Sequence, residues 1–342
     1  MSKLRKLLLD ALGDTTVGFI DIGARGGIPA HWNWLASKLH VTLFEPDSAE
    51  AEALRVQATS QGRKCTVVEA AVWNTAGTQS LNLTRSGACS SLLKPNRRFL
   101  DEFPDSERFD VLGQFETQSE TLDDVIGEDV SCDFLKIDAQ GGALMVLEGA
   151  GTCLEKAVGL EVEVEFVEMY EGEPLIGAVH TRLTDMGFEL VDLRPNYWKR
   201  SDAREVPGCK GQAIFCDTLY MISPSKFADK MKGLTHSDVA QSLARLLACC
   251  NVYGLDDWMV SYISICRERG LIDGTSGFTE IERRCRKGGL LARLPRIPGA
   301  AGIAMVLMDL AFHLGRGNPS WVYQDNSLAN MPRTRWTRWM RP

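Results

Sequence analysis

The sequence lacks the cysteine and histidine patterns that mark small domains held together by metals or disulfides. Its ten cysteines are scattered over 342 residues, with no CxxC pair and no Cys/His cluster at zinc spacing. With 44% hydrophobic and 24% charged residues, a chain of this length can bury a core without such support. We therefore expect neither a structural metal site nor a secreted disulfide framework, and we expect a reduced, cytoplasmic protein.

The sequence also lacks an apolar run of membrane-spanning length. The longest late run, residues 299–308, is about half of the roughly 20 residues that a bilayer span requires. The opening stretch MSKLRKLLLDALGD is interrupted by Asp10 and has no small-residue cleavage site, so we interpret it as an amphipathic helix rather than a signal peptide. We expect no transmembrane segment.

The formal net charge of −7 combines two parts of opposite sign. Residues 1–220 carry 21 Lys and Arg against 35 Asp and Glu, whereas residues 221–342 carry 17 against 10. Strand patterns also give way to helical ones near residues 222–233, so we predict one domain over 1–222 and a helical extension over 223–342. The extension ends in the basic Arg/Trp tail PRTRWTRWMRP, for which a solvated tail and a peripheral contact with a membrane or anionic partner are both open.

Short β-rich runs alternate with helical patterns along the first domain. The seven candidate strands are 17–21, 41–44, 66–69, 134–138, 160–166, 188–193 and 213–221, and the helical patterns are 48–59, 143–153 and 176–186 in the domain, then 237–250 and 256–269 in the extension. This alternation predicts a doubly wound, Rossmann-like α/β sheet. Residues 78–121 are too long for a simple crossover, and we predict an insert that forms a hairpin or lid over the sheet's edge.

The stretch VGFIDIGARGG places an acid and a glycine turn at the end of the first predicted strand. Ligands of doubly wound sheets bind at this edge, where glycines let backbone N–H groups approach them. Glu45 ends the second strand 24 residues after Asp21, a suitable place for a carboxylate that accepts hydrogen bonds from a ribose diol. Because Arg25 replaces the second glycine of GxGxxG, a nicotinamide cofactor is disfavoured and S-adenosylmethionine (SAM) fits better.

Several sequence blocks occur in an order that resembles one protein family. They are FIDIGARGG, LFEPD, VVEAAVWNTAG, the pair Ser90 and Ser91, ETQSETLDDVI, DFLKIDAQGGALMVLEGA, EVEVEFVEMYEGEPL and GFELVDL. Over about residues 15–220, the chain resembles the FkbM family of SAM-dependent methyltransferases. The resemblance implies the seven-stranded class I methyltransferase sheet, SAM as cofactor, and O-methylation of a hydroxyl on a sugar or other small natural product.

The resemblance also implies the cofactor residues. Asp21, Gly23 and Gly27 would line the methionine end, with Ala24 and Arg25 in the same turn. Glu45 would bind the ribose, with Pro46 and Asp47 beside it, and Glu69, Ala70 and Ala71 would flank the adenine. For Ala70 and Ala71, close packing of a strand end is an equally open interpretation.

The block DFLKIDAQGG places a cation and an acid two residues apart on one strand. Lys136 and Asp138 therefore point to the same side of the pleat, beside the methyl donor. Asp138 could take the hydroxyl proton as a general base or coordinate a divalent cation, with Lys136 holding it ionised. A structural salt bridge is the alternative. One departure from the family is Ala143, where the family usually has Glu.

The run LEVEVEF places three acids on one face of the fifth strand. Glu163 and Glu165, nearest its carboxyl end, are further candidates for an acceptor or metal site, unless the strand is an exposed edge. Tyr170 could stack on a sugar ring, and Arg194 with residues 197–200 could bind a phosphate, although a solvated loop is also open. We leave His31 and His180 out of the catalytic set, because such histidines more often pack or lie at the surface.

The sequence therefore predicts a SAM-dependent O-methyltransferase that acts on a saccharide or a saccharide-bearing intermediate. A non-catalytic protein that keeps the methyltransferase fold as an interaction platform is the alternative. We expect a small-molecule acceptor and no nucleic acid, and leave a homo-oligomer and a divalent metal open.

Overall fold

The main sheet of the computed structural model contains the seven predicted strands and one more. The structure describes residues 1–60, 64–127, 130–206, 209–273 and 277–287, with residues 299, 302–303, 306–307, 310, 321–324 and 328. In spatial order the strands are β11 (Val322–Gln324), β9 (Phe188–Trp198), β10 (Gln212–Ile222), β8 (Gly159–Glu165), β7 (Phe134–Ile137), β1 (Val17–Ile22), β2 (Leu39–Phe44) and β3 (Cys65–Val68).

Strand directions confirm the predicted fold class. Strands β3, β2, β1, β7 and β8 run parallel to one another, whereas β10 is antiparallel to both of its neighbours. Apart from the added edge strand β11, this is the mostly parallel, seven-stranded class I methyltransferase sheet. The order reverses at β1, from which the chain first builds toward β3 and later toward β9, so a ligand site is expected beside β1.

Helices cover the sheet and largely follow the predicted periodicity. Those before β10, apart from the helices between β5 and β6, are α1 (Lys3–Leu12), α2 (Ser48–Ser60), α4 (Leu122–Ile126), α5 (Ala143–Glu148), α6 (Gly151–Lys156) and α7 (Ile176–Asp185), with the 3-10 helices η1 (Ala30–Lys38) and η4 (Ser201–Ala203). The prediction of a single helix over 143–153 is wrong, because the helix is interrupted between α5 and α6. A β-carbon at Gly149 would lie 2.2 Å from the carbonyl oxygen of Trp73, so only glycine permits this close packing.

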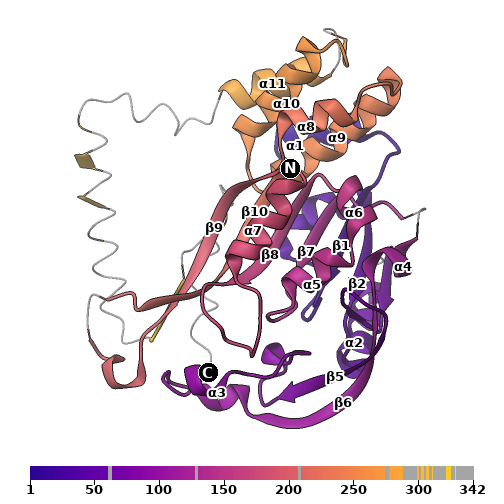
Figure 1. Cartoon of the computed structure of the whole chain (residues 1–342). Helices are drawn as coiled ribbons and strands as arrows, with labels where there is room; N and C mark the ends of the chain where they lie inside the picture. Colours follow the sequence, from indigo (N-terminus) through magenta and orange to yellow (C-terminus); the bar gives the residue numbers. More distant parts are fainter. Residues whose placement is uncertain are drawn as a thin grey trace.

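The segment between β3 and α4 forms a second, smaller sheet. Its strands are β4 (Ala71–Val72), β6 (Val111–Glu120) and β5 (Gly77–Thr84), in that spatial order, and β5 pairs with β6 in antiparallel register. Between β5 and β6 lie η2 (Gly87–Cys89), α3 (Arg97–Leu100) and η3 (Ser106–Phe109). Figure 1 shows β5 and β6 at the bottom of the molecule, beyond the ends of β1 and β2.

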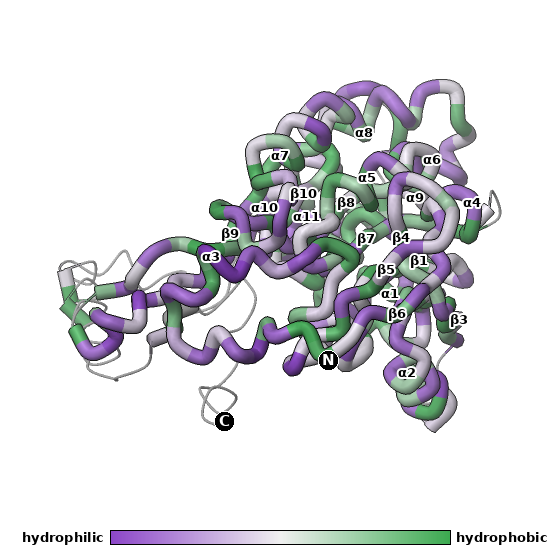
Figure 2. Tube along the Cα trace, turned by 60° about the horizontal axis from the view of Figure 1, so that its bottom comes forward, coloured by the Kyte–Doolittle hydropathy of each residue, from purple (hydrophilic) through white to green (hydrophobic). Residues whose placement is uncertain are grey.

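The helices after β10 pack on the sheet itself. They are α8 (Pro224–Lys230), α9 (His236–Val252), α10 (Asp256–Glu268) and α11 (Phe278–Lys287), and with α1 they gather at the end of the sheet opposite β5 and β6 (Figure 1). Leu243 and Tyr262 belong to the same buried cluster as Phe134 and Leu160, so sheet and helices share one hydrophobic core. Hydrophobic residues accordingly gather around β7, β8 and α5 in Figure 2.

One disulfide departs from the expectation of fully reduced cysteines. Cys132, just before β7, is bonded to Cys153 in α6, with their α-carbons 5.8 Å apart. The predicted Arg/Trp tail lies outside the described residues. Within the described parts of the chain, no helix has the length and apolar character needed to span a membrane.

Candidate functional site

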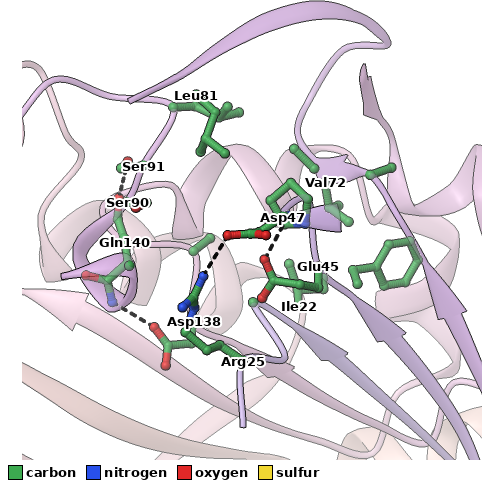
Figure 3. Close-up of a pocket in the computed structure, with 18 of the residues that line it drawn as sticks. Ile22, Arg25, Glu45, Asp47, Val72, Leu81, Ser90, Ser91, Asp138 and Gln140 are labelled. Carbon is green, nitrogen blue, oxygen red and sulfur yellow. Dashed lines mark hydrogen bonds and ion pairs between the residues drawn. The ribbon is translucent and has the colours of Figure 1, made fainter. Parts of the chain in front are cut away.

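A pocket opens where β1, β2 and β7 end, between the main sheet and the insert. Its empty volume is about 930 Å³, which includes space open to solvent. Glu45 and Asp138 line it from the ends of β2 and β7, while Leu81 and Ser91 line it from the insert (Figure 3). This is the edge at which ligands of doubly wound sheets bind.

Only part of the predicted site lines this pocket. The predicted residues that do so are Gly23, Arg25, Glu45, Pro46, Asp47, Ala70, Ala71 and Asp138. Those that lie outside the lining are Asp21, Ala24, Gly27, Glu69, Lys136, Glu163 and Glu165. Glu45, predicted to bind a ribose, and Asp138, predicted to act as the base, therefore both line the pocket.

The glycine turn after β1 packs tightly against the end of β7. Gly23 has a φ of 77°, and a β-carbon there would lie 1.9 Å from the carbonyl oxygen of Asp138. The N–H groups of Gly23 and Ala24 both donate to the carbonyl of Phe44 at 3.1 Å. Only glycine fits at position 23, and this keeps the turn and Asp138 side by side.

Glu45 presents a buried carboxylate to the pocket. Its side chain is 5% exposed, and its Oε1 accepts a hydrogen bond from the N–H of Asp47 at 3.0 Å. Burial raises the pKa of Glu45, while the Asp47 N–H and the Arg25 guanidinium act in the opposite direction. A carboxylate in this setting retains oxygen lone pairs that can accept further hydrogen bonds.

Arg25 joins the glycine turn to α2 and to the insert. Its guanidinium pairs with Asp47 at 3.1 Å and with Glu50 at 3.0 Å. A β-carbon at Gly87 would lie 2.5 Å from Arg25 Nη1, so the insert packs directly over this side chain. Glu69, by contrast, is bonded to Ser48 and to Arg55 outside the pocket.

A row of buried charges lies under the pocket. Lys136 Nζ is 3.1 Å from Asp21 Oδ1 and 3.8 Å from Asp138 Oδ2. Burial raises the pKa of Asp21 to about 7, with Lys136 acting against this shift. Burial disfavours the charge of Lys136, but Asp21, Asp138 and Glu161 outweigh it and raise the pKa of Lys136 above its ordinary value.

Glu161 and Glu165 of β8 are buried and Glu163 is half-buried, so the exposed-edge interpretation is wrong. β8 lies between β10 and β7. Glu161 accepts from the Tyr253 hydroxyl at 2.6 Å, Glu163 from the Gln140 amide at 2.6 Å, and Glu165 from the Gly141 N–H at 3.2 Å. Burial, together with neighbouring acids, raises the pKa of both Glu163 and Glu165 well above the ordinary range.

One other predicted contact is wrong in this structure: Tyr170 is fully buried, so it presents no ring face to a sugar. Arg194, the candidate for a phosphate, is 2.7 Å from Asp217 and forms an ion pair with it. His31 is half-buried, and this burial lowers its pKa to about 4, so it stays neutral near pH 7.

Sequence reasoning missed Gln140, which lines the pocket beside Asp138. Its amide Nε2 lies 2.8 Å from Asp138 Oδ1 (Figure 3). Glutamine is uncharged, so the search for acids and cations along the strands did not select it. Its position two residues after Asp138, in DAQGG, was the one signal in the sequence that could have suggested a role. Among the described residues, no group of three or more His, Cys, Asp or Glu is placed to hold a metal ion.

Residues 21–190 match the family described as the methyltransferase FkbM domain. A comparison with curated proteins gives no match.

Solved structures resemble the chain only distantly. Precorrin-6y C5,15-methyltransferase from Geobacter metallireducens GS-15 has 14% identity, covers 65% of this chain and 92% of its own, and gives a TM-score of 0.32. An rRNA methylase from Streptococcus thermophilus has 11% identity; the match covers 64% of this chain and 94% of the methylase, with a TM-score of 0.32. TehB from Haemophilus influenzae has 9% identity, with 64% and 62% covered and a TM-score of 0.33. Scores of this size are too low to transfer an activity.

Proposed function

Because this chain belongs to the FkbM methyltransferase family, we propose that it transfers the methyl group of SAM to a hydroxyl oxygen of a small-molecule acceptor. The observation that carries this proposal is a single pocket with the Glu45 carboxylate on one side and the Asp138 carboxylate on the other. The first can bind a ribose and the second can take a proton. One pocket thus offers a group for binding the cofactor and a group for deprotonating the acceptor.

The residues around the pocket fit SAM. Glu45 has lone pairs for the two ribose hydroxyls, and the small residues Ala70 and Ala71 leave room for the adenine. Asp21 Oδ2 is buried and has no hydrogen-bond partner within the described part of the chain, so it remains an acceptor behind the Gly23 turn for the amino group. These features support Asp21, Gly23, Glu45, Ala70 and Ala71 as cofactor residues.

The residues at the end of β7 support acid–base chemistry. When bound, SAM supplies an electrophilic methyl group on a sulfonium. Asp138 would accept the proton of the acceptor hydroxyl as its oxygen bonds to that methyl carbon and the carbon–sulfur bond breaks. Lys136 Nζ lies 3.8 Å from Asp138 Oδ2, so its ammonium attracts this carboxylate electrostatically and helps to hold it in place. The protein otherwise contributes positioning.

The pocket lining supports an acceptor with a polar and an apolar side. Ser90, Ser91 and Gln140 lie with Asp138, whereas Leu81 and the neighbouring leucines of the insert are apolar. A sugar hydroxyl on a larger natural-product or glycan intermediate fits both. We also propose that the enzyme modifies carbohydrates in the cytoplasm and binds no nucleic acid; the net charge of −7 supports only the last of these.

Cofactor binding provides the first test. Calorimetry should show SAM binding but no NAD binding, and Glu45→Gln should weaken SAM about 10- to 100-fold, since hydrogen bonds to a charged acceptor are worth about 1.5–3 kcal/mol. Glu52→Gln makes the same change on the exposed side of α2, where Glu52 pairs with Arg55, and should leave the affinity unchanged. Binding of NAD in place of SAM would overturn the assignment.

Turnover provides the second test, and it separates an enzyme from an interaction platform. Asp138→Asn should lower methyl transfer by about 10²- to 10⁴-fold, the usual contribution of a general base, while SAM still binds. The alternative platform is favoured by Ala143, which is buried at the start of α5 where the family usually has Glu. Wild-type protein that binds SAM without any transfer would favour that alternative.

A further inference from the structure

Gln140 connects four separate segments around the candidate base. Its Nε2 donates to Asp138 Oδ1 at 2.8 Å and to Glu163 Oε1 at 2.6 Å, and its Oε1 accepts from the Tyr170 hydroxyl at 2.9 Å. Its backbone carbonyl accepts from Ser91 Oγ at 2.6 Å. The end of β7, β8, the loop after β8 and the insert therefore meet at this one residue.

We propose that Gln140 is the positioning residue of the methyl transfer: its amide aims the carboxylate of Asp138 at the acceptor by bridging it to Glu163 and Tyr170. This inference rests on the proposed function, because it needs Asp138 to act on an acceptor hydroxyl.

The chemistry of the three partners explains why the residue is an amide. Its two N–H groups face carboxyl oxygens of Asp138 and Glu163, and its carbonyl oxygen faces the Tyr170 hydroxyl. A flipped amide would turn its oxygen toward Asp138 and Glu163, and both N–H donations to these acids would be lost. The carbonyl of Cys89, 3.0 Å from the Tyr170 hydroxyl, is a second acceptor within reach of the single phenolic proton.

No other residue of similar shape satisfies these contacts. A glutamate at position 140 would set a third carboxylate between Asp138 and Glu163, and the like charges would repel one another. A methionine would remove the donor to Glu163, which lies among other acids inside the fold. Glutamine alone keeps the shape and supplies both donors and the acceptor.

The backbone at Gln140 points to a need for its side chain. Its φ is 44°, in the left-handed region that residues other than glycine seldom adopt, and Gly141 follows with a φ of 85°. If only the turn mattered, glycine would serve better at position 140. The fold keeps a strained glutamine there, at the pocket wall and beside Asp138.

The test uses three variants of the full chain and one control. Gln140→Met removes the side-chain hydrogen bonds. Gln140→Gly removes them too and also relieves the backbone strain of the positive φ at this position. Gln140→Glu keeps the shape of the side chain and adds a negative charge. Gln118→Glu makes the same charge change on β6, where Gln118 is exposed and only reaches Thr78 Oγ1 at 3.4 Å. Initial rates would be measured with methyl-tritiated SAM and a small-molecule extract of the cells that make the protein.

The three variants should separate positioning from cofactor binding. We expect Gln140→Met and Gln140→Gly to lose about 10²-fold in rate at saturating SAM, at the lower end of what a placed general base contributes, with the apparent KM for SAM within about threefold of wild type. Gln140→Glu should move the acidic limb of the pH–rate profile upward by about one pH unit. Gln118→Glu should behave as wild type.

Each outcome decides the matter. Rates of Gln140→Met and Gln140→Gly within about threefold of wild type, with an unmoved pH profile in Gln140→Glu, would overturn the inference and leave the proposed function standing. Rescue of the rate in Gln140→Gly alone would also overturn it, because the backbone would then be what matters. Wild-type protein that transfers no label would overturn the proposed function and this inference together.

Discussion

Replacing Tyr253 by phenylalanine tests how the helices after β10 support the charged row beneath the pocket. The Tyr253 hydroxyl, at the end of α9, donates to Glu161 Oε2 at 2.6 Å, and both residues are buried. Burial and the Glu161 charge raise the pKa of Tyr253 well above the ordinary range, so the hydroxyl stays a donor. The phenylalanine ring fills nearly the same space, so the change isolates the hydrogen bond.

The expected loss of unfolding free energy is about 2 kcal/mol, because a hydrogen bond to a charged group contributes about 1.5–3 kcal/mol. Glu161 lies opposite Lys136 in the β7–β8 register, and losing its donor leaves a buried carboxylate oxygen unpaired. Urea unfolding followed by circular dichroism measures the difference at constant slope.

Tyr220→Phe is the matched control. Tyr220 is buried too, but its hydroxyl lies 3.1 Å from an imidazole nitrogen, Nδ1 of His180, and not from a carboxylate, so its loss should cost only about 0.5–1.5 kcal/mol. A Tyr253→Phe cost equal to or smaller than that of Tyr220→Phe would refute the charge-assisted bond between α9 and β8.

Two further predictions concern titration and covalent structure. Burial raises the pKa of Glu173 from 4.5 to about 7, so the folded chain holds a proton that the unfolded chain has released, and stability is lost as pH rises between these values. In the wild type, the unfolding free energy should therefore fall between about pH 5 and 8, and Glu173→Gln should reduce this fall by on the order of 2 kcal/mol. Glu171→Gln, at an exposed position, should leave the fall unchanged. Equal pH dependence in both variants would contradict the raised pKa of Glu173. Reducing the Cys132–Cys153 disulfide, which spans 21 residues, should lower the unfolding free energy by roughly 3 kcal/mol. The difference between urea unfolding curves recorded with and without a phosphine reductant measures this loss. Thiol titration of the unreduced, unfolded chain should count eight thiols, and a count of ten would contradict the bond.

The sheet could be predicted because its strands are short, regular and rich in β-branched residues. The run LEVEVEF correctly predicts β8, but its alternation also fits an exposed edge. What makes it a central strand is that the donors for its acids come from far along the chain, Gln140 and Gly141 on one side and Tyr253 on the other. Such pairing is tertiary and leaves no local pattern.

The parts of the fold that escaped prediction share a long-range cause. β11 joins β9 across more than 100 residues of sequence, and no periodicity signals a three-residue strand. The break between α5 and α6 follows from the close approach of Trp73 to Gly149. A glycine inside a helical pattern is a weak signal, and the residue it meets lies in another segment.

The site divides in the same way between local and tertiary information. Glu45 and Gly23 could be placed because a fixed spacing along a strand–turn–helix unit sets their positions. Glu69 follows β3 as predicted, yet its carboxylate turns to Ser48 and Arg55 of α2. The left-handed backbone of Gln140 could not be predicted, since it is maintained by contacts of its side chain.

The charged row explains why the helical extension and the sheet form one core. Asp21 on β1 lies opposite Lys136 on β7, and Lys136 lies opposite Glu161 on β8. Two carboxylates and one ammonium beneath the pocket are costly to bury unless each finds a partner. Lys136 donates a hydrogen bond to Asp21, and Glu161 accepts one from the hydroxyl of Tyr253, a residue of the helical extension. The extension therefore supplies a partner for the charges that hold Asp138 beside the pocket.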